Sequence, residues 1–391
     1  MEPARLKREL GMWGAVVTGL SSIIGTGAFV SIGVASENWG DLVLIAVPGA
    51  ALVAIFSGLS SAFLAGRFPV AGGTYEYAYE TLNPWLGFTS GWLFLLAKTA
   101  SAATAALGVT LGLGIDGWAA PMGVAAAVTL MVLAGVRRTA IANLVLMAVS
   151  VTGIVWFLFS AIGDRLTSFA PVSVEPRGAL GAVAFLFVAY TGYGRLATLG
   201  EEVRDPERVI PAAVVSTLAV AAILYMAIAV GGRLLGGPTW GTSIALPTVD
   251  QPVVRVAAIS AMLGVMVNLV LGLSRVWLAM GRRGDMPRSL SRLDRSSQPR
   301  TAILVTGALV AVTTLVGDIG LAWSFSAMTV LLYYGVTNLA AIRIAPGRVS
   351  AWVGMASCLL LSVFVPFGVW ALGAGLIAVG LLWKAWPRQA S

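Results

Sequence analysis

The 391-residue sequence contains no histidine and one cysteine, Cys358. Without histidine, the chain has no imidazole for acid–base catalysis or for zinc. A single cysteine also excludes an intrachain disulfide and a site built from clustered thiolates. No HExxH, GxSxG or P-loop pattern occurs, so we expect no enzyme, no metal site and no organic cofactor.

Charged residues are also scarce, at 11% of the chain against 58% hydrophobic residues. A soluble domain carries roughly 25% charged residues because its surface must face water. Here the apolar residues come in blocks about long enough to cross a hydrocarbon core of about 30 Å. We therefore expect an all-α, multi-pass membrane protein in contact with the lipid bilayer.

Apolar blocks between charged or Gly/Pro-rich breaks predict about twelve membrane-spanning helices. Basic residues precede the first block as in a signal peptide, but its length and the later blocks favour a retained helix. Residues 72–83 predict a short interfacial helix, with Tyr75, Tyr77, Tyr79 and Trp85 as interface anchors. The expected spans are 12–35, 41–65, 85–113, 120–136, 140–163, 179–199, 211–236, 253–281, 301–316, 319–343, 349–365 and 368–386.

Most of the 25 Lys and Arg residues lie on one side of this map. The positive-inside rule then orients the chain with both termini in the cytoplasm, in a cell (inner) membrane. The formal net charge of +8 includes no basic stripe interleaved with aromatic residues, so we expect no nucleic acid partner. The arginines that fall on the other side are Arg165, Arg177, Arg233 and Arg255.

Glycine pairs interrupt the first and sixth expected spans. Gly25 and Gly27 lie near the middle of the first span, and Gly192 and Gly194 in the middle of the sixth. Glycine inside a helix costs about 1 kcal/mol relative to alanine and relaxes the backbone. The interruptions are five spans apart, which favours an inverted repeat whose broken helices meet at the membrane midplane. Close helix packing is the alternative role for these glycines.

A helix broken within the membrane frees backbone groups that protein, water or ligand must satisfy. A half-helix that starts there offers N–H groups to an anion, and one that ends there offers carbonyls to a cation. Two such breaks side by side can bind a carboxylate and an ammonium with backbone alone. This arrangement favours a zwitterionic amino acid as the ligand.

Four stretches of the chain carry longer motifs. They are SSIIGTGAF (21–29), FPVAGGTYEYAYETLNPWLGFTSGW (68–92), YTGYGRLATLGEEVRDPERVIPAA (190–213) and LSRVWLAMGRRGDMP (273–287). Together and in this order, they resemble the amino acid–polyamine–organocation (APC) superfamily of amino acid permeases. The resemblance extends over residues 12–300.

The resemblance implies a LeuT-like 5+5 inverted repeat with two additional C-terminal helices. The first repeat would cover residues 1–163, the second 164–345, and the peripheral pair 346–391. Some relatives bind a heavy chain through a cysteine in the loop after the third helix. The matching loop here, about 114–119, contains no cysteine, so we expect no disulfide-linked heavy chain and a monomer or weak homo-oligomer.

The resemblance also implies a substrate site. The substrate carboxylate would meet the backbone of the first break, and its amino group would meet carbonyls beside both breaks. The second break would line the side-chain pocket, with Tyr193 as a gate. The implied substrate-binding residues are Ile23, Ile24, Gly25, Thr26, Gly27, Ala189, Tyr190, Thr191 and Gly192.

Coupling is expected to depend on a buried cation. Many proton-coupled or sodium-independent relatives carry a lysine on the fifth helix, but the matching position here is Ser150. Lys98 instead lies deep in the third span, where a charge costs a few kcal/mol unless it is paired or hydrated. Lys98 is interpreted as a proton-coupling group, with a structural lysine tied to a helix end as the alternative. Sodium is the other candidate ion, with Asn268 as a candidate oxygen donor or interhelical hydrogen-bonding group.

Arg195 directly follows the sixth-span break and has two interpretations. It pairs with Glu201 or Glu202 in a cytoplasmic gate, or it supplies charge to an anionic substrate side chain. Helical spacing places Glu202 on the same face two turns on, which favours the ion pair.

These observations predict a secondary amino acid transporter that works by alternating access, as a proton symporter or an exchanger. Thr191, Gly192 and the absence of acidic residues deep in the third and sixth spans favour a neutral, small or hydrophobic substrate. The alternatives are a transporter of polyamines, amines or cationic amino acids, and a sensor that does not transport. A channel would need polar positions repeated on several spans, and none are found.

Overall fold

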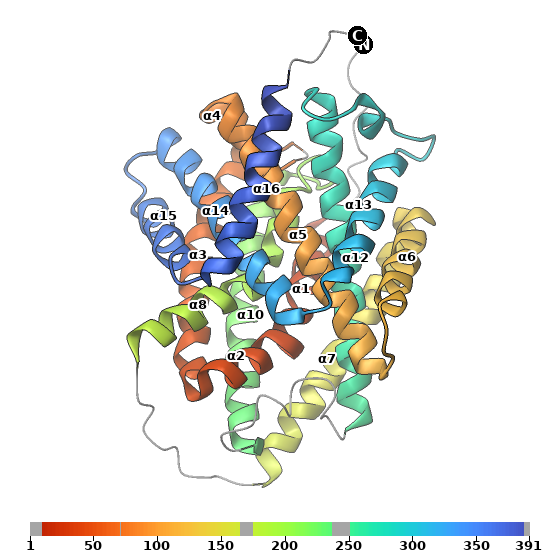
Figure 1. Ribbon diagram of the computed structural model, residues 1–391, viewed down its shortest axis with the longest axis vertical. Coiled ribbons are helices and arrows are strands. Elements are labelled where there is room, and N and C mark those ends of the chain that lie inside the picture. Colours follow the sequence, from red (N-terminus) through yellow and green to blue (C-terminus); the bar gives the residue numbers. More distant parts are fainter. Residues whose placement is uncertain (1–9, 71, 165–174, 237–250, 387–391) are drawn as a thin grey trace.

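The protein is described by a computed structural model that covers residues 10–70, 72–164, 175–236 and 251–386 (Figure 1). Within these ranges the chain is helical and forms no strand. The main helices are α1 (Met12–Ile23), α2 (Ile32–Trp39), α3 (Val43–Arg67), α4 (Thr74–Thr81), α5 (Pro84–Leu113), α6 (Ala119–Leu133), α7 (Val136–Asp164), α8 (Pro176–Tyr190), α9 (Gly194–Ala197), α10 (Pro206–Gly236), α12 (Pro252–Arg282), α13 (Arg300–Thr313), α14 (Ile319–Ile344), α15 (Val349–Ser362) and α16 (Phe367–Ala385).

Eight helical segments of the described chain are long and apolar enough to cross a membrane. The first, Met12–Arg67, runs through α1, α2 and α3 and so covers two of the expected spans. Three further apolar segments are shorter: Ala119–Leu133, Arg300–Val316 and Val349–Ser362. The all-helical, multi-pass prediction is confirmed, whereas the map of twelve spans stays a prediction.

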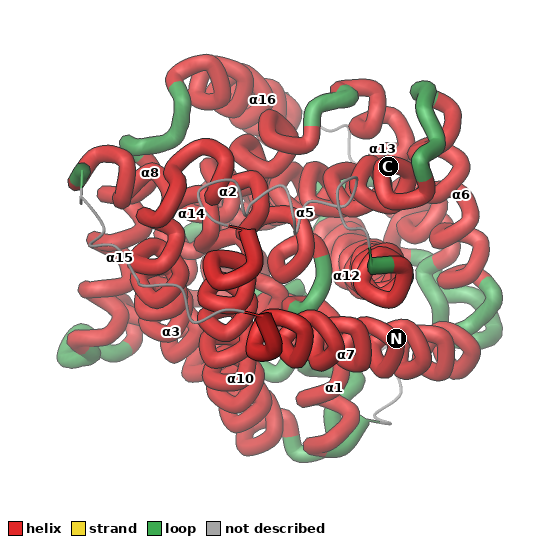
Figure 2. Tube along the Cα trace, turned by 90° about the horizontal axis from the view of Figure 1, so that it is seen from below, coloured by secondary structure: helices red, strands yellow, loops and turns green. Residues whose placement is uncertain are grey.

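Small residues let the long helices approach closely, as expected where lipid replaces water. A Cβ atom at Gly58 of α3 would lie 2.5 Å from Leu218 Cδ1 of α10. Large apolar side chains such as Phe159, Ile223 and Leu382 point outward and are at least about two-thirds exposed, which suits a surface in contact with acyl chains. In the end-on view, α15 and α16 lie at the periphery of the bundle (Figure 2).

One end of the bundle, called here the α4 end, gathers α4, the start of α1 and the C-terminal ends of α12 and α16 (top in Figure 1). Its central contact is a buried carboxylate, Asp285, which accepts hydrogen bonds from Tyr75 and Tyr79 and pairs with Lys384. The indole of Trp383 donates to the Asp285 carbonyl at 3.0 Å. These contacts attach the last helix to α4 and to the end of α12.

The short helix predicted within residues 72–83 is present as α4, but the prediction of interface anchors was wrong for two of its tyrosines. Tyr75 and Tyr77 are fully buried. Tyr75 donates to Asp285 Oδ2 at 2.8 Å, and Tyr77 donates to the Ala197 carbonyl at 3.2 Å. Both partners come from distant parts of the sequence, so local aromatic patterning did not reveal them. Trp85 is half exposed.

Asp285→Asn is expected to lower the free energy of unfolding by about 2 kcal/mol or more, because Lys384 and two tyrosine hydroxyls lose a charged acceptor. The measurement is the thermal unfolding midpoint of purified protein. Asp318→Asn is the matched control, because Asp318 caps α14 by accepting from Leu321 N–H and asparagine caps helices equally well. Equal midpoints for the two variants would contradict this role of Asp285.

Candidate functional site

The first helix is interrupted at Ile24 and Gly25. Ile24 adopts an extended conformation at the end of α1, and the chain resumes through a π-helical turn, Gly27–Ser31, that leads into α2. The N–H groups of Ala28 and Phe29 both donate to the Gly25 carbonyl, at 3.0 and 3.1 Å. Gly25 therefore begins a new helical segment, whose first N–H groups have no acceptor in a preceding turn.

A second interruption follows α8. The chain leaves Tyr190 through a 3-10 turn, Thr191–Tyr193, and then forms the single turn of α9. The Thr191 hydroxyl donates to the Val188 carbonyl at 2.7 Å. The last carbonyls of α8 thus lie at the point where regular α-helix stops and must find other donors.

The two interruptions lie against each other through glycine. A Cβ atom at Gly192 would lie 2.2 Å from the Ser22 carbonyl oxygen, and one at Gly27 would lie 2.8 Å from Ala189 Cβ. Neither position has room for a side chain. The break and the close packing that the sequence left as alternatives therefore occur in the same contact.

Tyr225 of α10 connects the two interruptions. Its hydroxyl lies 2.6 Å from the Ile23 carbonyl oxygen and 3.1 Å from that of Ala189. Both carbonyls were expected to receive the substrate amino group, and each keeps a second lone pair. The sequence did not indicate Tyr225, because nothing in its span distinguishes it from a core aromatic residue.

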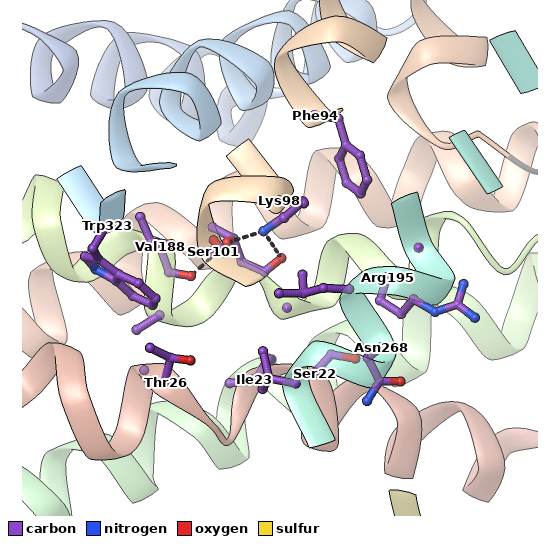
Figure 3. A pocket seen from close by; sticks show the side chains of 17 residues that line it. Ser22, Ile23, Thr26, Phe94, Lys98, Ser101, Val188, Arg195, Asn268 and Trp323 are labelled. Carbon is purple, nitrogen blue, oxygen red and sulfur yellow. Dashed lines mark hydrogen bonds between the residues drawn. The ribbon is translucent and has the colours of Figure 1, made fainter. Parts of the chain in front are cut away.

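A buried cavity of about 40 Å³ lies between the interruptions (Figure 3). Almost all of its lining residues are buried, and Leu269 alone is partly exposed. The volume suffices for roughly three or four water molecules. The lining residues are Ser22, Ile23, Thr26, Gly27, Phe94, Lys98, Ser101, Val188, Ala189, Thr191, Gly192, Arg195, Val265, Asn268, Leu269, Gly272 and Trp323.

Most of the expected substrate-binding residues line this cavity, but Ile24, Gly25 and Tyr190 do not. Gly25 packs against α12, where a Cβ atom would lie 2.0 Å from Val265 Cγ2. The Tyr190 hydroxyl donates to the Val47 carbonyl at 3.1 Å. Ser22, Phe94, Ser101 and Trp323 line the cavity without having been predicted.

Thr26 gives the cavity an unsatisfied polar atom. Its Oγ1 is buried and has no hydrogen-bond partner among the described residues. A buried hydroxyl left without a partner costs about 1–3 kcal/mol. A polar group of a ligand in the cavity would remove that cost.

Lys98 reaches across the cavity to the end of α8 (Figure 3). Its Nζ donates to Thr191 Oγ1 at 2.7 Å and to the Thr191 carbonyl at 3.3 Å. No ion pair joins it to an acidic side chain in the described part of the chain. A cation at a helix C-terminus is stabilised by the helix dipole. This geometry matches the structural alternative for Lys98, while its role in coupling stays a prediction.

The predicted ion position on α7, Ser150, does not line the cavity. Its hydroxyl donates to the Leu146 carbonyl of its own helix at 2.6 Å. From α7, Asn143 instead donates to Ser21 Oγ at 2.8 Å and accepts from Asn268 Nδ2 at 3.1 Å. This hydrogen-bonded cluster joins α1, α7 and α12 beside the cavity.

A second cavity, of about 60 Å³, lies toward the α4 end and is partly lined by residues from that end. Arg195 and Asn268 line both cavities, and Leu10, Glu202 and Arg275 line only the second. In the close view, the Arg195 guanidinium points away from Lys98 and Thr26 (Figure 3). Arg195 therefore presents its stem to the first cavity and its charge toward the second.

Glu202 forms ion pairs with both arginines that line the second cavity. Arg275 donates from Nε to Glu202 Oε1 at 3.0 Å and from Nη2 to Oε2 at 3.3 Å, and Arg195 Nη2 lies 3.9 Å from Oε1. Burial alone would raise the pKa of Glu202. The guanidinium groups of Arg275 and Arg195 lower it by more than burial raises it, so the pKa of Glu202 lies below its ordinary value. The Glu202 carbonyl also accepts from Leu10 N–H at 3.0 Å.

The helical continuity assumed between Arg195 and Glu202 was wrong, because α9 ends at Ala197 and turns bring Glu202 back. Arg195 Nη1 donates to Thr198 Oγ1 at 2.8 Å. Glu201 pairs with Arg282 at 2.9 Å instead of with Arg195. Tyr193 does not line the cavity, and its ring packs 5.1 Å from that of Tyr334.

Comparison with known proteins identifies the family. The chain matches the amino acid permease family model over residues 14–388 and therefore belongs to that family. It is 35% identical to an uncharacterized transporter of Mycobacterium tuberculosis (strain ATCC 25618 / H37Rv), over 97% of this chain and 91% of the relative.

More distant similarities give a mixed view of substrates. A branched-chain amino acid permease of Bacillus subtilis (strain 168) is 26% identical to this chain, over 80% of this chain and 75% of the relative. A chloroplastic cationic amino acid transporter, number 7, of Arabidopsis thaliana is 24% identical over 92% and 70%. The resemblance to the APC superfamily is confirmed, and the relatives are transporters, not enzymes.

Gly192→Ala is expected to lower the free energy of unfolding by about 1–3 kcal/mol or more, because its new Cβ would press on the Ser22 backbone. The thermal unfolding midpoint measures this loss. Gly123→Ala in α6 is the control, since a Cβ atom there meets nothing within 4 Å and alanine favours helix. A Gly192→Ala midpoint as high as that of the control would rule out the close contact of the interruptions.

Glu202→Gln is expected to lower the unfolding midpoint most at neutral pH. A carboxylate whose pKa is lowered in the folded state stabilises the fold above its unfolded-state pKa, and this is lost as pH falls through the folded-state pKa. The difference between wild type and variant should therefore shrink on acidification. Glu37→Gln, at an exposed position, is the matched control for the loss of one carboxylate. A difference for Glu202→Gln that is constant with pH would contradict the assignment.

Proposed function

We propose that this permease is a secondary active transporter that moves a small neutral amino acid across the inner membrane by alternating access. The single observation that carries the proposal is the buried cavity where two interrupted helices meet, with the Thr26 hydroxyl unsatisfied inside it. Membership of the amino acid permease family supports the same class of substrate.

The proposed architecture is a 5+5 inverted repeat, residues 1–163 and 164–345, followed by a peripheral pair in 346–391. In such a repeat, α5 of the first half is equivalent to α12 of the second, and α7 of the first half is equivalent to α14 of the second. Extensive packing of α12 on α7 is accordingly matched by extensive packing of α14 on α5. The contact of α3 with α8 likewise has its counterpart in that of α10 with α1. This pairing of contacts supports the repeat.

The proposed substrate pose uses backbone groups at both ends of the cavity. The substrate carboxylate would accept hydrogen bonds from N–H groups at the start of the segment after Gly25 and from the Thr26 hydroxyl. The amino group would take the free lone pairs of the Ile23 and Ala189 carbonyls, beside Tyr225.

The lining of the cavity favours a neutral substrate side chain. It includes the cationic Lys98 and the apolar stem of Arg195, and no Asp or Glu. A lysine, arginine or polyamine substrate would therefore bring extra positive charge into a buried site without a counterion. The small volume favours side chains about the size of that of alanine or serine.

Alternating access would then involve the α4 end, which faces the cytoplasm in the proposed orientation. Glu202 holds Leu10 through its backbone and Arg195 and Arg275 through its carboxylate. These contacts connect the segment before α1, the turn after α9 and the helix α12. Opening the cavity toward this end would require separating them, which makes this cluster the proposed gate.

Purified protein is expected to gain thermal stability from alanine, serine or another small neutral amino acid, and to gain none from lysine, arginine or polyamines. Proteoliposomes loaded with the stabilising amino acid should then show counterflow of its labelled form. Stabilisation by polyamines alone would overturn the substrate preference. Stabilisation without counterflow or gradient-driven uptake would favour a sensor over a transporter.

Lys98 is proposed to couple protons to transport, because its amine binds Thr191 at the second interruption. Loss of its proton would weaken that contact and free the end of α8. Lys98→Ala is therefore expected to lose acceleration of uptake by an inward proton gradient while keeping counterflow. Gradient-driven uptake that persists in Lys98→Ala would remove this role and favour sodium coupling or exchange.

A further inference from the structure

A groove of about 650 Å³ opens on the outer surface near the α4 end, separate from both buried cavities. It lies between the last turns of α3, the first turns of α10 and the connection from α14 to α15. Its apolar wall includes Leu59, Phe63 and Val215, and Val215 is about half exposed. None of these side chains lines the buried cavity between the two interruptions.

Three charged side chains line the same groove. Arg67 is the last residue of α3, and Arg348 precedes α15 with its guanidinium 4.0 Å from the centre of the Phe63 ring. Neither guanidinium forms an ion pair with an acidic side chain of the described residues. The third, Glu207, lies in the first turn of α10, where a carboxylate is stabilised by the helix dipole. The groove thus carries a net positive charge.

We propose that this groove binds an anionic membrane phospholipid. Its phosphate would lie between Arg67 and Arg348, because guanidinium groups bind phosphate oxygens in pairs. One acyl chain would follow Leu59 and Val215 along the outside of α3 and α10. Arg67 ends a helical segment that is long and apolar enough to cross a membrane, so its side chain would lie at headgroup depth.

The combination of features selects a lipid over a soluble anion. A soluble phosphate needs the two arginines but gains nothing from the exposed apolar wall beside them. A neutral phospholipid uses the wall, but its cationic headgroup offsets the attraction of the guanidinium groups. An anionic lipid uses both, and clusters of basic residues at the cytoplasmic membrane surface attract such lipids.

The test titrates phosphatidylglycerol into purified protein held in zwitterionic detergent and follows the unfolding midpoint. Arg67→Gln and Arg348→Gln are each expected to raise the apparent Kd about fivefold. Glu207→Gln is expected to lower it, because the groove loses its one negative charge. Arg295→Gln, at an exposed arginine outside the groove, is the matched control and should leave the Kd unchanged.

Three results would overturn the proposal: equal stabilisation by phosphatidylcholine, equal stabilisation by soluble glycerol 3-phosphate, or wild-type affinity in both arginine variants. The opposite shift expected for Glu207→Gln cannot arise from misfolding, so it keeps the test decisive if an arginine variant is unstable. The lipid titration contains no transported substrate, and its outcome is independent of the proposed function.

Discussion

Backbone hydrogen bonding inside the membrane is the constraint on which this structure depends. A helix that stops in lipid frees N–H and C=O groups, and each must find a partner. The protein places its two interrupted helices against each other, with Gly192 on the Ser22 backbone. Tyr225 bonds the Ile23 and Ala189 carbonyls, and Lys98 binds the end of α8. The buried cavity lies between the two interruptions, with the Thr26 hydroxyl unsatisfied inside it.

The same interruption connects the cavity to the α4 end of the bundle. After α9 the chain turns back, so that Glu202 forms an ion pair with Arg275 and lies close to Arg195. Arg195 and Asn268 line both cavities, which makes them the shared wall between the buried site and the charged cluster. In the proposed mechanism, a substrate that changed the second interruption would therefore act directly on Arg195, which lies in the proposed gate.

Features of the fold that have a local cause could be predicted from the sequence. Gly25, Gly27, Gly192 and Gly194 marked the interruptions, because glycine weakens a helix wherever it stands. Long apolar blocks likewise predicted the helices. Contacts between helices could not be predicted this way, since the partners of Tyr225 and Asn143 are set by packing. Local periodicity also misled, as when it extended one helix from Arg195 to Glu202.

Placement of a bound substrate tests the central claim most directly. An experimental structure of the permease with a small neutral amino acid should show the ligand between the two interruptions. Its carboxylate should lie at Thr26 and Gly27, and its amino group at the Ile23 and Ala189 carbonyls. A ligand bound elsewhere, with the space between the interruptions closed by protein, would contradict the account.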